Sequence, residues 1–213
     1  GKRTLTLMAG LTQEKDKLLG STGAGAFSLS GSRSDTTFAT LKAQAQLGDD
    51  VFLTGITTLA YTNMTRPRHS LLGSSNDVKS SSHSLIINKR HLLGDDNLSA
   101  FIAQPNRISS GSIEVHIPTL ADSYGTINYN AKNISLEPSS RQLNYGLSYR
   151  KNISDDLSFS FKHLVTNNPN HTDDSHTWHS SFTGLRYKNT SLGFSTNPAT
   201  SNSEFRLTYS SQF

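Results

Sequence analysis

The sequence predicts an all-β protein: an antiparallel meander β-barrel of about 8–12 strands, joined by tight Gly/Ser-Asp-Asp turns. Three observations carry this prediction. Apolar and polar residues alternate in segments spread along the chain, a turn-forming tetrapeptide recurs, and longer polar stretches separate the resulting hairpins. No linker rich in Pro or Gly divides the 213 residues, so we expect residues 1–213 to form a single domain.

Alternation with a period of two is the signature of a strand with one apolar and one polar face. In the segment 141–151, for example, Leu143, Tyr145, Leu147 and Tyr149 alternate with small or polar residues. The segments that are long enough and regular enough to cross a bilayer as tilted strands are 37–47, 51–61, 141–151 and 203–213.

The recurring tetrapeptide ends in two aspartates and precedes an apolar segment each time. It reads Leu-Gly-Asp-Asp at 47–50 and 93–96, and Ile-Ser-Asp-Asp at 153–156. Gly accepts a positive φ, and Ser and Asp side chains bond to their own backbone, so each tetrapeptide predicts a tight turn. Paired aspartates could instead form a calcium or catalytic site, but the turn explains them without a ligand.

Polar stretches at 62–82, 119–132 and 166–177 are longer than these turns. Short turns at one rim and long loops at the other are typical of a closed barrel, although a β-sandwich would also tolerate them. Pro105 and Pro118 lack a backbone N–H, so we expect the segment 98–117 to bend or to divide into two short strands.

Composition excludes several classes of protein. Hydrophobic residues make up 33% of the chain, and no apolar run approaches the roughly 20 residues of a membrane-spanning helix. The absence of cysteine excludes disulfides and Cys-ligated metals. Lys and Arg are scattered, so the net charge of +4 does not predict nucleic-acid binding. The start at Gly1, with neither an initiator Met nor a signal peptide, suggests an origin inside a longer precursor.

The C-terminal segment alternates up to a terminal aromatic residue. It resembles the closing strand of bacterial outer-membrane proteins, whose last aromatic is read by the barrel assembly machinery. The resemblance implies an assembly signal and departs from the pattern at Ser211, where an apolar residue is usual. The residues that we assign to this signal are Phe205, Leu207, Tyr209 and Phe213.

A set of short motifs, spread over residues 5–187, resembles the C-terminal β-rich region of Gram-negative subtilisin-like serine peptidases of the autotransporter type. They are Leu18-Leu19-Gly20-Ser21, Gly25-Ala26-Phe27, Leu92-Leu93-Gly94-Asp95-Asp96, the segments 104–112 and 134–141, and Gly184-Leu185-Arg186-Tyr187. The resemblance implies a translocation or anchoring barrel in the outer membrane, in contact with lipid and attached to an N-terminal passenger or protease domain. The chain extends past the family's usual ending near 184–187.

The catalytic motifs of those peptidases are absent from this sequence, so we expect no enzymatic activity and no cofactor. Four histidines, His163, His171, His176 and His179, form the one cluster that resembles a metal site, and we interpret them as polar loop residues. The alternative to a membrane barrel is a soluble, extracellular β-sandwich or β-barrel with a structural, adhesive or assembly role. In that case the apolar faces would point inward.

Overall fold

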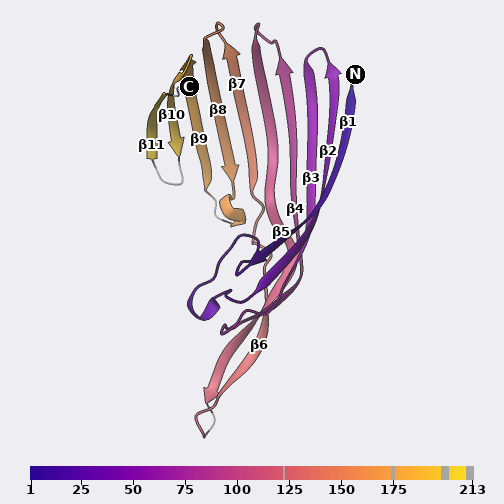
Figure 1. Ribbon diagram of the computed structural model, residues 1–213, viewed down its shortest axis with the longest axis vertical. Coiled ribbons are helices and arrows are strands. Elements are labelled where there is room, and N and C mark those ends of the chain that lie inside the picture. Colours follow the sequence, from indigo (N-terminus) through magenta and orange to yellow (C-terminus); the bar gives the residue numbers. More distant parts are fainter. Residues whose placement is uncertain (122, 174–175, 198–201, 210–213) are drawn as a thin grey trace.

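The computed structural model describes residues 1–121, 123–173, 176–197 and 202–209, and these form one antiparallel sheet (Figure 1). The strands are β1 (Arg3–Lys15), β2 (Arg33–Gly48), β3 (Val51–Met64), β4 (Leu72–Arg90), β5 (Asp96–Ala121), β6 (Ile127–Ser135), β7 (Leu143–Asn152), β8 (Leu157–Asn167), β9 (Thr177–Tyr187), β10 (Thr190–Asn197) and β11 (Asn202–Tyr209). Two short 3-10 helices, η1 (Gly25–Phe27) and η2 (Pro169–His171), lie in loops. The predicted all-β meander is confirmed.

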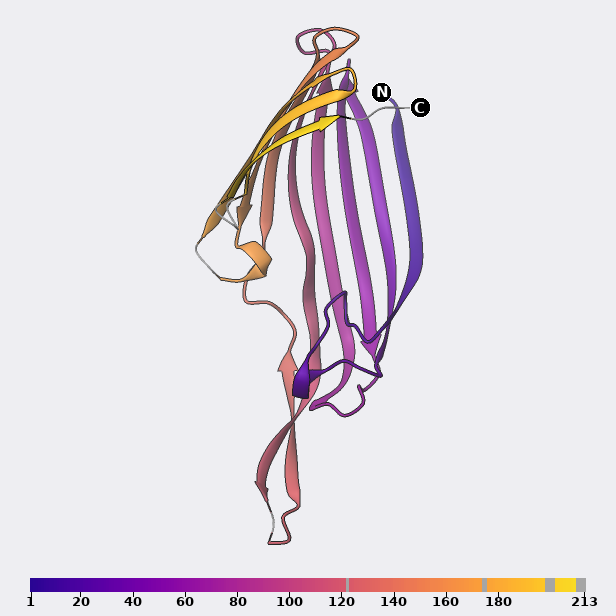
Figure 2. The ribbon, with the colours of Figure 1, turned by 60° about the vertical axis from the view of Figure 1, so that its left-hand side comes forward.

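The strand order is β1-β2-β3-β4-β5-β7-β8-β9-β10-β11, and β6 lies off this path, paired with the second half of β5. We call the strands of the path the wall and the β5–β6 extension the arm, which projects from the lower end of the sheet in Figure 1. The wall is strongly curved, since β9, β10 and β11 turn across the front of the sheet in Figure 2.

The three tetrapeptides all lie between antiparallel neighbours at the upper end of Figure 1, which confirms the predicted turns. Asp50 adopts a positive φ of 60°. The Asp96 carboxylate accepts hydrogen bonds from the Leu92 and Leu93 amides at 2.6 and 2.9 Å. We call this end the turn rim. The opposite end carries the longer connections 16–32 and 65–71, the arm, and the segment around η2.

The expected division of 98–117 into two short strands is wrong, because β5 continues as one strand from Asp96 to Ala121. The alternative expectation, a bend, coincides with a shift in the register of the β4–β5 pairing beside Pro105. Pro105 lies just beyond the last pair with β7, Ala103 with Asn144, and beside an irregular part of the β4 ladder. Pro118 lies beyond the last pair with β4, where only β6 flanks the strand. A missing N–H costs little at both places. Much of 62–82 and 119–132 is likewise strand rather than loop.

A small hydrophobic core closes the loop end of the sheet. Leu18 and Leu29, from the segment that links β1 to β2, pack with side chains of β3 and β5. This segment is tied to the next loop by backbone hydrogen bonds from Arg68 to Ser30 and from Leu71 to Ala26, each 2.8 Å long. The remaining core members are Met64, Ile113 and Val115, with Leu19, Leu72 and Leu136 packed against them.

Candidate functional site

The candidate site is a surface: one face of the wall carries most of its exposed large apolar side chains. Strand pairing places alternate residues of neighbouring strands on the same face, as in the row Leu53, Ile87 and Ala100. We call this face the outer surface. Its exposed large apolar side chains are Leu5, Leu7, Leu11, Leu41, Leu47, Leu59, Tyr61, Leu85, Ile87, Ile102, Leu147, Leu185, Tyr187, Leu192, Phe194, Phe205, Leu207 and Tyr209.

Charged side chains on the outer surface lie at its margins. Arg3, Lys89 and Lys151 lie near the turn rim, and Lys79 lies toward the loop end. Within the described rows between these margins, the one charged outer position is Arg107, which is level with Ser81 and whose guanidinium bonds to Glu137 at 3.1 Å. The surface is therefore a band almost without charge, with cations and the carboxylates of Asp35 and Asp96 at its margins.

The opposite face, which we call the inner surface, is polar and more buried. Its buried side chains include hydroxyls that bond to each other between strands: Thr36 Oγ1 lies 2.8 Å from Thr62 Oγ1, and Thr40 Oγ1 lies 2.8 Å from Thr58 Oγ1. Soluble β proteins bury the apolar face and expose the polar one. In this wall the polar face is the more buried one, and the apolar face is exposed.

The height of the apolar band follows from the strand rise. From Leu5 to Leu11 on β1 there are six residue steps, and from Ala39 to Leu47 on β2 there are eight. At about 3.3 Å per residue these rows are about 20 and 26 Å long, which corresponds to about 15 and 20 Å along the axis of a barrel whose strands tilt by about 40°. The apolar band of transmembrane barrels is about 25 Å tall, so the rows reach roughly 60–80% of that height.

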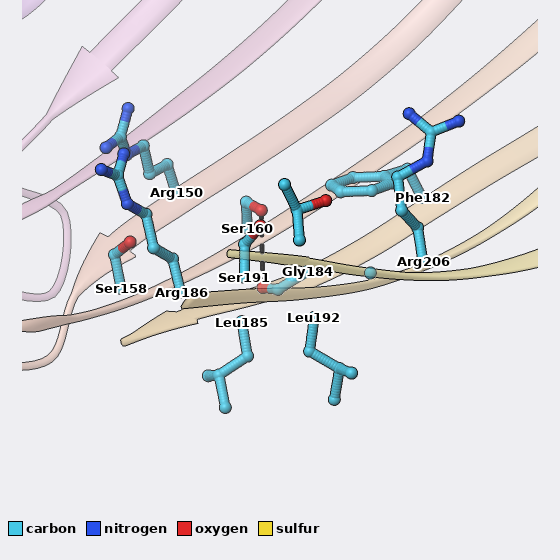
Figure 3. Close-up of a pocket in the computed structure, with 12 residues that line it drawn as sticks. Arg150, Ser158, Ser160, Phe182, Gly184, Leu185, Arg186, Ser191, Leu192 and Arg206 are labelled. Atoms are coloured by element: carbon cyan, nitrogen blue, oxygen red, sulfur yellow. Dashed lines mark hydrogen bonds between the residues drawn. The ribbon is translucent and has the colours of Figure 1, made fainter. Parts of the chain in front are cut away.

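Figure 3 shows the two surfaces at one place in β7–β11. Arg150, Arg186 and Arg206 project to one side of the strands together with several serines, whereas Leu185 and Leu192 project to the other side. The polar side chains surround a hollow of about 430 Å³ on the inner surface. The arginines were not singled out in the sequence, although their alternation with outer apolar residues is the signal that could have found them.

The predicted assembly signal lies partly on this outer surface. Phe205, Leu207 and Tyr209 are 68%, 67% and 71% exposed on the outer side of β11, and Phe213 lies outside the described residues. In the described part of the chain, β11 pairs with β10 alone and β1 pairs with β2 alone. The three residues therefore continue the band to the last described strand.

No known protein family, curated protein or solved structure matches the chain. The resemblance to autotransporter-type peptidases therefore stays a prediction. In the described residues, no helix is both long enough and apolar enough to span a membrane.

The four histidines do not converge on one point. The rings of His163 and His179 lie side by side on the outer surface, with their centroids 5.8 Å apart. His171 lies at η2, where its Nδ1 accepts a hydrogen bond from the Gln142 amide at 2.9 Å. His176 lies before β9. Among the described residues, no three His, Cys, Asp or Glu side chains are placed to share a metal ion.

Burial and hydrogen bonding shift the pKa of His171. Its ring is partly desolvated, which lowers its pKa, and Arg107 nearby acts in the same direction. The hydrogen bond between its Nε2 and the Asn106 carbonyl, 3.0 Å long, opposes this shift without cancelling it. The ring is therefore held in its neutral form, in which Nδ1 can accept the Gln142 N–H.

Proposed function

We propose that the chain is a non-catalytic translocation or anchoring β-barrel of the bacterial outer membrane, the C-terminal part of an autotransporter-like secreted protease. The observation that supports this proposal best is the outer surface, a largely apolar band on the exposed face of the wall. In this role the band contacts lipid, the C-terminal strand is recognised by the barrel assembly machinery, and an N-terminal passenger or protease domain is held or passed.

The energetics of the band favour a lipid environment. A large apolar side chain gains about 1.5–3 kcal/mol when it is removed from water. The outer surface exposes such side chains on nearly every wall strand, including Leu7 at 74% and Leu59 at 58%. Soluble monomers rarely expose a contiguous apolar patch larger than a few hundred Å². A bilayer would cover the whole band at once.

Insertion also requires the wall to close, because unpaired strand edges are not tolerated in hydrocarbon. The pairing of the wall gives the geometry of closure. Arg3 of β1 is level with Ser203 of β11 through the row Ala45, Leu53, Ile87, Ala100, Leu147, His163, Ser181 and Thr196. β1 starts at the turn rim and β11 ends there, so the two strands are antiparallel.

Barrel geometry sets how far β1 and β11 must be shifted along each other where the two strands would meet. Ten wall strands about 4.8 Å apart, tilted by about 40°, need a stagger of about 40 Å, or about 12 residues. Only one direction of stagger keeps β1 opposite β11. It places Tyr209 opposite Ala9 and Leu207 opposite Leu11, with all four side chains on the outer surface.

The test combines cross-linking with gel mobility. The chain has no cysteine, so Ala9→Cys with Tyr209→Cys creates the sole pair of thiols. We expect this pair to cross-link in detergent, whereas Thr57→Cys with Tyr209→Cys, which places the first thiol on β3, should not. Leu7→Cys and Leu11→Cys, each with Tyr209→Cys, bracket the register by two residues on either side.

Folded protein should also need detergent and should migrate differently in SDS gels before and after boiling. Cross-linking at none of the three β1 positions would overturn closure. A monodisperse protein in buffer without detergent would overturn the membrane role and favour the extracellular structural, adhesive or assembly module.

A further inference from the structure

The inner surface carries a strong excess of positive charge. Its basic side chains are Lys42, Arg90, Arg150, Lys162, Arg186 and Arg206, and its acidic ones in the described wall strands are Glu14 and Glu204. These six cations and two anions leave a surplus of four positive charges on the inner surface of the described wall strands.

The arginines of β7, β9 and β11 gather around the inner hollow of about 430 Å³. Arg150 and Arg186 line the same hollow, and Figure 3 shows their side chains on the same side of the strands. Ser158, Ser191 and Thr208 add hydroxyl groups to the lining, and the Ser160 hydroxyl donates to the Gly184 carbonyl at 3.4 Å. Two guanidinium groups beside several hydroxyls form a set of hydrogen-bond donors that suits a phosphate-type oxyanion.

Nearby carboxylates already have partners, one of them within the hollow. Glu204 accepts hydrogen bonds from Arg206 at 2.7 and 3.0 Å. Asp95, which lines a smaller neighbouring hollow with Arg150, accepts a hydrogen bond from Asn152 Nδ2 at 2.7 Å. Arg186 Nε donates to the Lys188 carbonyl at 3.1 Å, whereas the Arg150 side chain makes no hydrogen bond or ion pair with any other residue that the structure describes.

We propose that the inner surface around Arg150 and Arg186 binds phosphate-type anions from solution. This inference rests on the proposed barrel, in which the inner surface lines the lumen, and it adds a solute class to that function. Rings of Arg and Lys are what give pores their preference for anions. Apposed guanidinium groups without an acidic partner repel one another, and a bound anion would remove that repulsion.

The probe is inorganic pyrophosphate, measured by equilibrium dialysis at low salt against the folded chain in zwitterionic micelles. The test variant is Arg150→Gln with Arg186→Gln. The control is Lys151→Gln with Lys188→Gln, which removes the same charge at neighbouring positions: Lys151 lies on the outer surface, and Lys188 pairs with Asp156 in a turn.

We expect the arginine variant to lower the association constant at least tenfold and the lysine control to change it less than threefold. Equal losses in both variants, or no binding to the unaltered chain, would overturn the anion site. Phosphatidylglycerol added to the micelles should leave binding unchanged, whereas displacement by this lipid would overturn a site for solutes.

The change in gel mobility on boiling, measured on the same samples, tests the barrel independently of anion binding. A chain that keeps this change in mobility but binds no pyrophosphate refutes the anion site alone. A chain that is monodisperse without detergent refutes the barrel itself.

Discussion

Leu7 offers the sharpest test of what the outer surface contacts. It lies inside the apolar row from Leu5 to Leu11 on β1, two residues from Leu5 and four from Leu11, and it is 74% exposed. A lysine at the midplane of a transmembrane barrel costs about 2–4 kcal/mol. A lysine on a surface that faces water changes stability by less than about 0.5 kcal/mol. The free energy of unfolding that Leu7→Lys removes should therefore be several-fold larger if the outer surface faces lipid than if it faces water.

The matched control is Thr4→Lys, because Thr4 lies on the inner side of the same strand, is also exposed and is paired with the uncharged Gln44. Both variants add one positive charge to β1. Their free energies of unfolding are measured by guanidinium titration in phospholipid vesicles, with the fluorescence of Trp178, the single tryptophan, as the signal. We expect Leu7→Lys to be about 2–4 kcal/mol less stable than Thr4→Lys. A difference within about 0.5 kcal/mol would refute a lipid-facing band.

Three further predictions concern packing, hydrogen bonding and pH. Gly146→Ala would place a methyl group against the ring of Phe101 and should cost about 1–3 kcal/mol in urea unfolding, with recovery when Phe101→Leu is added. Thr36→Val leaves the buried hydroxyl of Thr62 without its partner and should cost about 1–3 kcal/mol, less when Thr62→Val is added. His171 has a lowered pKa, so its stabilisation is complete above about pH 6.5 and is lost as the pH falls further. The protection factor of the Gln142 N–H, which accounts for the slower intrinsic exchange at low pH, should fall on acidification. A protection factor that stays unchanged down to about pH 5 contradicts this.

Local patterns in the sequence predict most of the wall. The alternation at 51–61 and 141–151 predicts β3 and β7 with small errors at their ends, and the aspartate tetrapeptides predict the turn rim. Both signals are local, because side-chain alternation and turn chemistry depend on a few neighbouring residues. Which face of a strand is buried is not a local property. The sequence of a strand with one apolar face is the same whether that face packs against a protein core or contacts a bilayer.

The features that the sequence missed depend on partners far along the chain. Pro105 would interrupt the strand only if a neighbouring strand needed a backbone N–H at that position. Whether one does depends on where the pairing of β5 with β7 ends, which the local sequence does not show. The core at the loop end joins Leu18 and Leu29 to strands that follow much later, and neither residue belongs to a periodic segment. The arginine hollow likewise forms from three strands, each of which contributes one unremarkable residue.

Aromatic rings on the inner surface cover glycines on adjacent strands. The ring of Phe38 lies over Gly10, and that of Phe182 lies beside Gly184 and Gly193. An aromatic side chain that covers a strand glycine fills the space left by the missing Cβ and helps to fix the register. The wall uses this arrangement on β1–β2 and again on β9–β10.

The arm makes the orientation of the protein measurable. Beyond Val115, its last pair with β4, β5 continues to Ala121, so the tip lies about 20 Å past the sheet. Leu120 and Tyr124 near the tip are 86% and 93% exposed. The first residues of β1 lie at the opposite rim (Figure 1), so a protease site inserted in the tip and an epitope before β1 would face different compartments. If a protease added to intact vesicles cleaves the tip while an antibody cannot bind the epitope, the two ends of the protein lie on opposite sides of the membrane.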